Sequence, residues 1–186
     1  VFRNKPILFW IAFYFVGIFT FASLETIFSI FTKFKFDLPL KDIGYFFVYV
    51  GLAAALMQVL GISVLIRYLK DIQILLVGGF LLGLSLVLLP FSGDIVNYLF
   101  ILTIYAFGIG LSHPVILGII SKLSDREDYG VVLGVTQSSA RLAQVLGAFW
   151  AGFSYQYLGP SFPLLGAGFF MFFAFLILLF LYFGKY

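Results

Sequence analysis

The chain has 186 residues, of which 63% are hydrophobic and 10% are charged, and its net charge is +3. Soluble proteins average roughly 45–50% apolar and about 25% charged residues, so this chain has too few charges to cover a surface in water. These values exclude a soluble globular domain, a disordered chain and a nucleic-acid-binding domain. The absence of cysteine excludes disulfides and thiolate metal sites.

Six apolar stretches are each long enough to cross a bilayer as a helix, which takes about 20 residues. In chain order they are Pro6–Phe31, Ile43–Ile66, Ile72–Pro90, Val96–Ile120, Gly130–Tyr155 and Pro163–Phe183. Charged or turn-forming residues separate them, and nothing is left over for a soluble domain. The sequence therefore predicts an all-α, multi-pass membrane protein with one six-helix bundle over residues 1–186.

Lysine and arginine are distributed unevenly between the two sides of this bundle. With six spans both termini lie on one side, which carries Arg3, Lys5, Arg67, Lys70, Lys122, Arg126 and Lys185. The opposite side carries only Lys33, Lys35 and Lys41. Because cytoplasmic loops are enriched in lysine and arginine, we expect both termini and the loop cations Arg67 and Lys70 in the cytoplasm, and the protein in the plasma (inner) membrane.

The spans also differ in polarity. The third contains almost no polar side chain besides Ser85 and the sixth contains none from Pro163 to Leu181, whereas the other four carry several each. The order polar, polar, apolar thus occurs twice, as expected for two inverted three-helix repeats, here 6–90 and 96–183. The two apolar spans would then face lipid around an inner set of four. The alternative is that two of the six helices are apolar by chance.

Arg141 is the charged residue nearest the middle of a span. It lies 11 residues after Gly130, which corresponds to about 16 Å at the helical rise per residue. A charge at that depth must face a cavity, a counter-charge or backbone carbonyls. Helical spacing places it on a small and polar face with Gly134, Gln137, Ser138, Gln144 and Ala148. We expect this face to line or gate a substrate path; the alternative is a structural arginine that locks helices together.

Two further ionisable residues lie inside spans. Glu25 is about 28 Å along its helix, near the outer end of a core roughly 30 Å thick. It would bind a proton or pair with Arg141 through helix tilt or a water, and the alternative is an interfacial carboxylate. His113 is a candidate proton site, and the alternative is a histidine that satisfies a structural hydrogen bond. Pro114 follows it and is expected to kink the helix, since it cannot donate to the Gly110 carbonyl.

The fourth and fifth spans carry glycines at candidate packing positions, because glycine lets helix backbones approach closely. These glycines are Gly108, Gly110, Gly130, Gly134, Gly147 and Gly152. Tyr105 and Ser112 lie seven residues apart in the fourth span, so they share a helix face. We expect both to border a substrate path.

Signatures of enzymes are missing from the sequence. A membrane zinc protease would need two histidines in an HExxH pair, and the chain has one. Ser112 and His113 are adjacent, so on a helix they point about 100° apart and form no nucleophile–base pair. No cluster of acids suits a metal, and no glycine-rich nucleotide loop follows a strand. We therefore predict movement of a solute, without an enzyme reaction or a cofactor.

Three segments carry a resemblance to known transporters. The first two contain Gly108-Ile-Gly110-Leu-Ser-His-Pro114, then Ile120-Ser121-Lys122, then Gly130 to Gly152 with Gly134, Gln137, Ser138, Arg141 and Gly147. The third runs from Asp42 through Gly44, Tyr45, Gly51 and Gly61 to Arg67. In order and spacing these resemble the tenth, eleventh and eighth helices of a major facilitator superfamily transporter, most of all the drug/proton antiporter group that includes the tetracycline efflux proteins.

The resemblance implies the carboxy-terminal half of a twelve-helix fold, in which the first helix of each repeat lines a central cavity. Its partner would be an amino-terminal six-helix half or a second copy. The chain departs from the family at Ala148, where proline often follows glycine, and at Leu65, where the signature cytoplasmic loop has an aspartate. Gating contacts built on that aspartate are therefore not expected here.

Two functions from different classes follow. The first is secondary active transport of a small amphipathic solute by alternating access, with proton-coupled efflux as the expected mode. Arg141 would orient the solute or gate the path, Glu25 would supply a charge, and the solute would also touch Tyr45, Tyr49 and Tyr105. The second is a six-helix membrane subunit that binds a small ligand for a separate energising partner.

Overall fold

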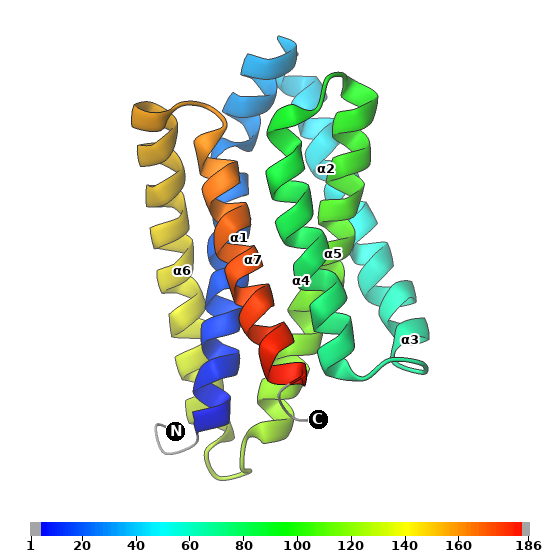
Figure 1. The fold of residues 1–186 in the computed structure, drawn as a ribbon, viewed down its shortest axis with the longest axis vertical. Helices are drawn as coiled ribbons and strands as arrows, with labels where there is room; N and C mark the ends of the chain where they lie inside the picture. The colour runs from blue at the N-terminus through cyan, green and yellow to red at the C-terminus, as the bar shows by residue number, and fades with distance from the viewer. Residues whose placement is uncertain (1–4, 184–186) are drawn as a thin grey trace.

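The computed structural model describes residues 5–183 as a bundle of helices (Figure 1). In chain order these are α1 (Lys5–Phe36), α2 (Leu40–Leu56), a π-helical segment η1 (Met57–Gly61), α3 (Ile62–Leu65), α4 (Asp71–Leu88), a 3-10 turn η2 (Leu89–Phe91), α5 (Ile95–Leu123), α6 (Tyr129–Leu158) and α7 (Phe162–Phe183). Because α2, η1 and α3 follow one another without a break, they form one span. The described residues therefore contain the six long helical segments that the sequence predicts.

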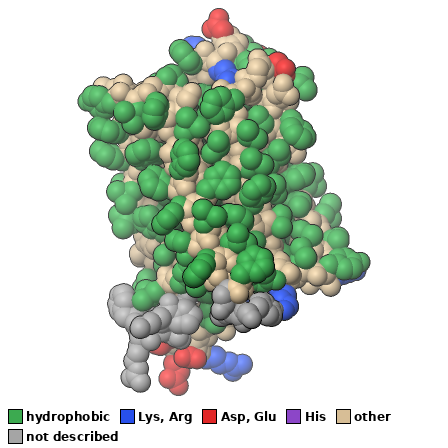
Figure 2. All heavy atoms as spheres, viewed as in Figure 1, with side chains coloured by type: hydrophobic (Ala, Val, Ile, Leu, Met, Phe, Trp, Pro, Cys, Tyr) green, Lys and Arg blue, Asp and Glu red, His purple; other side chains and the backbone are tan. Residues whose placement is uncertain are grey.

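Five of these segments are long and apolar enough to cross a membrane: Ile7–Phe36, Leu40–Leu65, Asp71–Phe91, Ile95–Leu123 and Phe162–Phe183. At 30 residues α6 is also long enough. It is not among them because glutamines, serines and Arg141 lower its mean hydropathy. Figure 2 shows hydrophobic side chains over the sides of the visible face and charged side chains at its two ends, as expected for a bundle that spans a bilayer.

The first helix is longer than its predicted span and continues to Phe36. Its last turn carries Lys33 and Lys35, and cations there complement the helix dipole. The Lys35 ammonium donates to the Pro90 carbonyl oxygen at 2.5 Å, which ties the end of α1 to the turn η2 that follows α4. Lysines thus mark the end of the apolar span, while the helix itself goes on into the interface.

The helices form two layers with a helix at each edge. In Figure 1 α4 and α7 lie in front of α1 and α5, with α6 at one edge and α2–α3 at the other. α1 packs against α6, and α5 packs in the same way against α2. α4 packs against α5, and α7 packs against α1. α4 and α7 also pack on each other. Exchanging α1 with α5, α2 with α6 and α4 with α7 preserves this set of contacts. Two inverted three-helix repeats over 6–90 and 96–183 stay a prediction.

Burial within the chain differs from the expectation that the third and sixth spans lie outside an inner set of four. Half of the apolar stretch of α4 is buried within the chain, whereas none of the apolar stretch of α2–α3 is buried. α4 is covered by both α5 and α7, whereas the edge helices α2 and α6 each lean mainly on one neighbour. The residues that α4 and α7 do expose are apolar, such as Phe80, Phe173 and Phe180. Those surfaces suit lipid, and the edge helices are the least covered part of this chain.

Two glycines hold the edge helices against the central pair. A Cβ at Gly110 would lie 2.7 Å from the Ala54 carbonyl oxygen of α2, and a Cβ at Gly147 would lie 2.5 Å from the Phe19 carbonyl oxygen of α1. Ser23 of α1 also donates to the Gly147 carbonyl oxygen at 3.2 Å. Under the exchange of helices described above, these two close contacts occupy equivalent places.

Of the other predicted packing glycines, one lies in a close helix contact and three face open space. A Cβ at Gly108 would lie 2.9 Å from the Leu82 backbone nitrogen, so this glycine brings α5 onto α4. A Cβ at Gly130, Gly134 or Gly152 would meet nothing within 4 Å, so these glycines make no close packing contact within the described part of the chain. α6 packs through another face, formed by the buried residues Val132, Thr136, Ala140, Ala143, Gly147, Ala151 and Ser154. Mostly small side chains on that face allow the close approach to α1.

Candidate functional site

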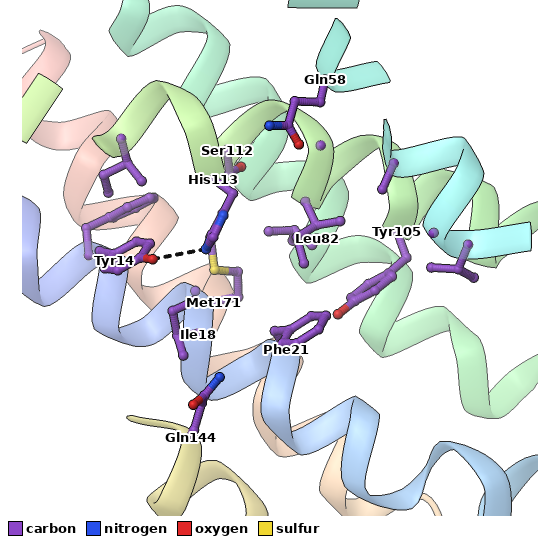
Figure 3. Close-up of a pocket in the computed structure, with 18 residues that line it drawn as sticks. Tyr14, Ile18, Phe21, Gln58, Leu82, Tyr105, Ser112, His113, Gln144 and Met171 are labelled. Atoms are coloured by element: carbon purple, nitrogen blue, oxygen red, sulfur yellow. Dashed lines mark hydrogen bonds between the residues drawn. The ribbon is translucent and has the colours of Figure 1, made fainter. Parts of the chain in front are cut away.

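A cavity of about 340 Å³ lies between α1, α2, α5 and α6, and α4 and α7 complete its wall (Figure 3). Its walls are mainly aromatic and aliphatic. Polar groups reach it from Tyr14, Gln58, Tyr105, Ser112, His113 and Gln144. Apolar walls with a few convergent hydrogen-bonding groups are typical of small-molecule sites.

A hydrogen bond between Tyr14 and His113 joins α1 to α5 across this cavity (Figure 3). The Tyr14 Oη lies 3.1 Å from the His113 Nε2, and the tautomer of the imidazole decides which atom donates. Tyr14 is buried, whereas His113 is exposed toward the cavity. α5 continues through Pro114 without a break. His113 therefore has a hydrogen-bond partner, as expected for a structural histidine. It is also accessible from the cavity, as expected for a proton site.

Tyr105 separates this cavity from a smaller one. Its side chain is 2% exposed, and its hydroxyl has no hydrogen-bond partner among residues 5–183. The smaller cavity measures about 170 Å³ and shares Phe21, Val50, Gly51 and Tyr105 with the larger one. Figure 3 shows the Phe21 ring facing the Tyr105 hydroxyl. These two side chains therefore stand between the two cavities.

Glu25 lines the smaller cavity and remains exposed. The described residues form an ion pair between Lys122 and Asp71, at 2.6 Å, but none between Glu25 and Arg141. Direct pairing of Glu25 with Arg141, one of the two roles that the sequence suggested, is therefore not seen. Glu25 contributes its charge to the smaller of the two cavities.

Arg141 is exposed and does not line the larger cavity. Its Nη1 donates to the Gln144 Oε1 at 2.9 Å, and Gln144 does line the cavity. Gln137 and Ser138 of the same predicted stripe are exposed beside it. Because α6 packs on α1 through its smaller residues, the polar stripe lies on the adjacent face, and only Gln144 reaches the cavity.

Of three other predicted path residues, Ser112 lines the larger cavity as expected, whereas Tyr45 and Tyr49 do not. The Ser112 hydroxyl points at Gly78 of α4 and fills the space that a Cβ would take there, so it serves the contact between α4 and α5. Tyr45 and Tyr49 are exposed on α2 and line neither cavity. The Tyr49 Oη lies 2.5 Å from the Thr103 Oγ1, which links α2 to α5.

The predicted loop cations lie near one another in sequence at the end of the bundle where α1 begins. Arg67 is exposed in the turn after α3. Lys70 precedes α4, and its backbone N–H donates to the Gln73 side chain at 2.9 Å. The ion pair of Lys122 with Asp71 ties the end of α5 to the start of α4 at the same end. Positive charge is thus held close to these helix ends.

Two cavity residues, Tyr14 and Gln58, lie outside the set that the sequence singled out. Gln58 interrupts an apolar run, and that polar interruption is a usable signal. It lies in η1, and π-helical segments occur frequently at functional sites. Tyr14 gives no such signal, because it is one aromatic residue among many in α1.

The fold and the cavity define a class, a multi-pass helical membrane protein with a cavity in its wall. Among residues 5–183 no group of three His, Cys, Asp or Glu could hold a metal ion. The family model of the Major Facilitator Superfamily matches residues 1–148. The chain therefore belongs to that superfamily, which is a family of transporters and not of enzymes, as the sequence predicted.

Among solved structures, the crystal structure of the human organic anion transporter MFSD10 (TETRAN) is similar, with a TM-score of 0.84 and 20% sequence identity. The match covers 94% of this chain and 41% of that chain, so this chain spans less than half of the matched transporter. At this identity the likeness shows the fold alone. No curated protein matches the chain. The predicted fold, six helices forming part of this transporter fold, is confirmed.

Proposed function

We propose that this chain is the carboxy-terminal half of a secondary active transporter that moves a small amphipathic solute by alternating access. The observation that carries the proposal is the cavity between α1, α2, α5 and α6. Its apolar walls would hold the hydrophobic part of a solute, and its few hydrogen-bonding groups would orient the polar part. Efflux, as in the drug/proton antiporter group that the sequence resembles, is the proposed direction.

Protons are the proposed coupling ion, and the pair of Tyr14 and His113 is the proposed site. Histidine is the side chain whose charge changes most readily near neutral pH. When protonated, both ring nitrogens donate, so Tyr14 would accept from His113 and could no longer donate to it. A proton would thereby change the link between α1 and α5 at the wall of the solute cavity. Glu25 in the smaller cavity would attract protons or cations toward it.

The exposed polar residues of the edge helices are the proposed contact with the rest of the transporter. Gln137, Ser138 and Arg141 of α6 are exposed at a depth where polar groups must face protein or water. Either an amino-terminal six-helix half or a second copy of this chain would cover them. We also propose that both termini are cytoplasmic and that the protein lies in the plasma (inner) membrane.

Reconstitution of the protein, as its gene encodes it, in proteoliposomes tests the function. With a proton gradient imposed, a panel of small aromatic amphiphiles is added and the internal pH is followed with a trapped fluorescent dye. We expect solute-dependent proton flux that liposomes without protein do not show. Solute binding without flux under any gradient would contradict transport and favour a ligand-binding membrane subunit.

A further inference from the structure

We infer that this half of the cavity binds the uncharged, hydrogen-bonding part of its solute, and that Arg141 is a positioning residue for Gln144 and not a counter-charge for the solute. The inference rests on the proposed transport function, because it names the class of solute for the same site. Four features of the cavity carry it: the lining, the bond from Arg141, the buried hydroxyl of Tyr105 and the volume.

Among the residues that the structure describes, no aspartate, glutamate, lysine or arginine lines the larger cavity. Its wall consists of aromatic, aliphatic and glycine residues with six polar but uncharged or weakly basic side chains. An ion that enters a cavity with such a lining loses its hydration without meeting an opposite charge. Its transfer from water is therefore unfavourable. A neutral group loses much less and regains hydrogen bonds, so this lining favours an uncharged solute.

The bond from Arg141 fixes which end of the Gln144 amide faces the solute. A guanidinium carries only donors, so its partner in the bond of 2.9 Å must be the amide oxygen of Gln144. The two residues are three positions apart in α6, where side chains share a face. With its oxygen held by Arg141, Gln144 has its NH₂ left to donate. Figure 3 shows this side chain pointing toward the cavity from α6.

Tyr105 offers a second hydrogen-bonding group from α5. Its hydroxyl is buried and has no partner in the described part of the chain. A buried polar group without a partner destabilises the structure, and a solute that bonds to it would remove that cost. Gln58 borders the same cavity from the α2 side. Hydrogen-bonding groups therefore converge on the cavity from three helical spans, none of them charged.

The cavity volume of about 340 Å³ sets the size of a suitable probe. A two-ring aromatic molecule with one small polar substituent falls within the range of ligands that cavities of roughly 300–1,000 Å³ bind. We choose 2-naphthamide, 2-naphthoate and 2-naphthylmethylammonium, which share one ring system and are neutral, anionic and cationic. Equilibrium binding of each radiolabelled probe is measured with the gene-encoded protein in nanodiscs.

We expect 2-naphthamide to bind most tightly. Arg141→Ala and Gln144→Ala should each weaken its binding about tenfold, the effect of losing one hydrogen bond. The double variant should be no weaker than either single variant, because both remove the same interaction. Arg141→Lys should restore most of the affinity, since an ammonium can donate to the same amide oxygen. Arg126→Ala, which removes a positive charge from the loop before α6, is the matched control and should bind like the unchanged protein.

Two results would overturn the inference while leaving transport intact. One is tighter binding of 2-naphthoate than of 2-naphthamide, with Arg141→Ala weakening the anion alone. The other is a double variant in which the two losses multiply. If none of the three probes binds, the inference fails as well. The expected selectivity without transport under any imposed gradient would instead contradict the proposed function.

Discussion

Replacing Gly147 with alanine should separate α6 from α1. The added methyl group would lie 2.5 Å from the Phe19 carbonyl oxygen and 3.1 Å from the Ala22 Cβ, and the first distance is far below van der Waals contact. Both obstacles belong to the backbone or its first side-chain atom, so no flexible side chain can move aside. The helices must part by several tenths of an ångström, which also stretches the bond of 3.2 Å from Ser23 to the Gly147 carbonyl.

Overpacking of a close contact lowers the free energy of unfolding by roughly 1–3 kcal/mol, and we expect a loss of about 2 kcal/mol here. For a protein of this size that cost lowers the midpoint of thermal unfolding by roughly 4–8 °C. Gly152→Ala is the matched control on the same helix, because a Cβ there meets nothing within 4 Å. It should leave the midpoint unchanged or raise it slightly, since alanine favours helix more than glycine does.

Intrinsic tryptophan fluorescence during heating in detergent measures both variants. Trp150 lies on α6 and donates to the Pro163 carbonyl oxygen at 3.3 Å, so its emission reports on the packing of this helix. A Gly147→Ala variant as stable as the unchanged protein would refute the close contact. Equal losses in the Gly147 and Gly152 variants would refute the assignment of the buried face of α6.

Three further predictions follow from the structure. Phe21→Ala should join the two cavities on either side of Tyr105, so that probes with a third aromatic ring bind better while 2-naphthamide binds less well; equilibrium binding of a probe series by size checks this, and an unchanged size limit would contradict it. Lys35→Met should destabilise the protein by about 1–3 kcal/mol, because the Pro90 carbonyl loses its charged donor; thermal unfolding measures this, with Lys33→Met as the control. Ser124→Cys, the single cysteine in the variant chain, should react with an impermeant maleimide only from the cytoplasmic side; labelling of intact cells from outside would reverse the proposed orientation.

The six helical segments were predictable because their signals are local. Apolar length identifies each span, and residues such as Lys70 and Asp71 interrupt the pattern between two of them. The helix ends were less predictable, as α1 shows by continuing past Lys33. Helix propensity does not stop where hydrocarbon stops, so charges mark the limit of the apolar span more sharply than that of the helix.

The face of α6 that packs was not predictable from one sequence. Two stripes compete at helical spacing, a polar one through Arg141 and a small one through Ala143 and Gly147. Polarity alone favours the first as the inner face, but close approach between helices needs small side chains, and the second stripe supplies them. The partnership of His113 with Tyr14 was equally hidden, because 99 positions separate the two residues.

The edge position of α2–α3 has a mechanical consequence. This span packs on α5 through α2, where Gly110 meets Ala54, and through η1, whereas its last segment, α3, packs mainly on η1 of its own span. A helical span that is held along most of its length and loosely at its last segment can bend there at little cost in broken contacts. The end of the span that carries Arg67 can therefore move sideways while the middle stays in place, and Gln58, between the two, would turn with it at the wall of the cavity.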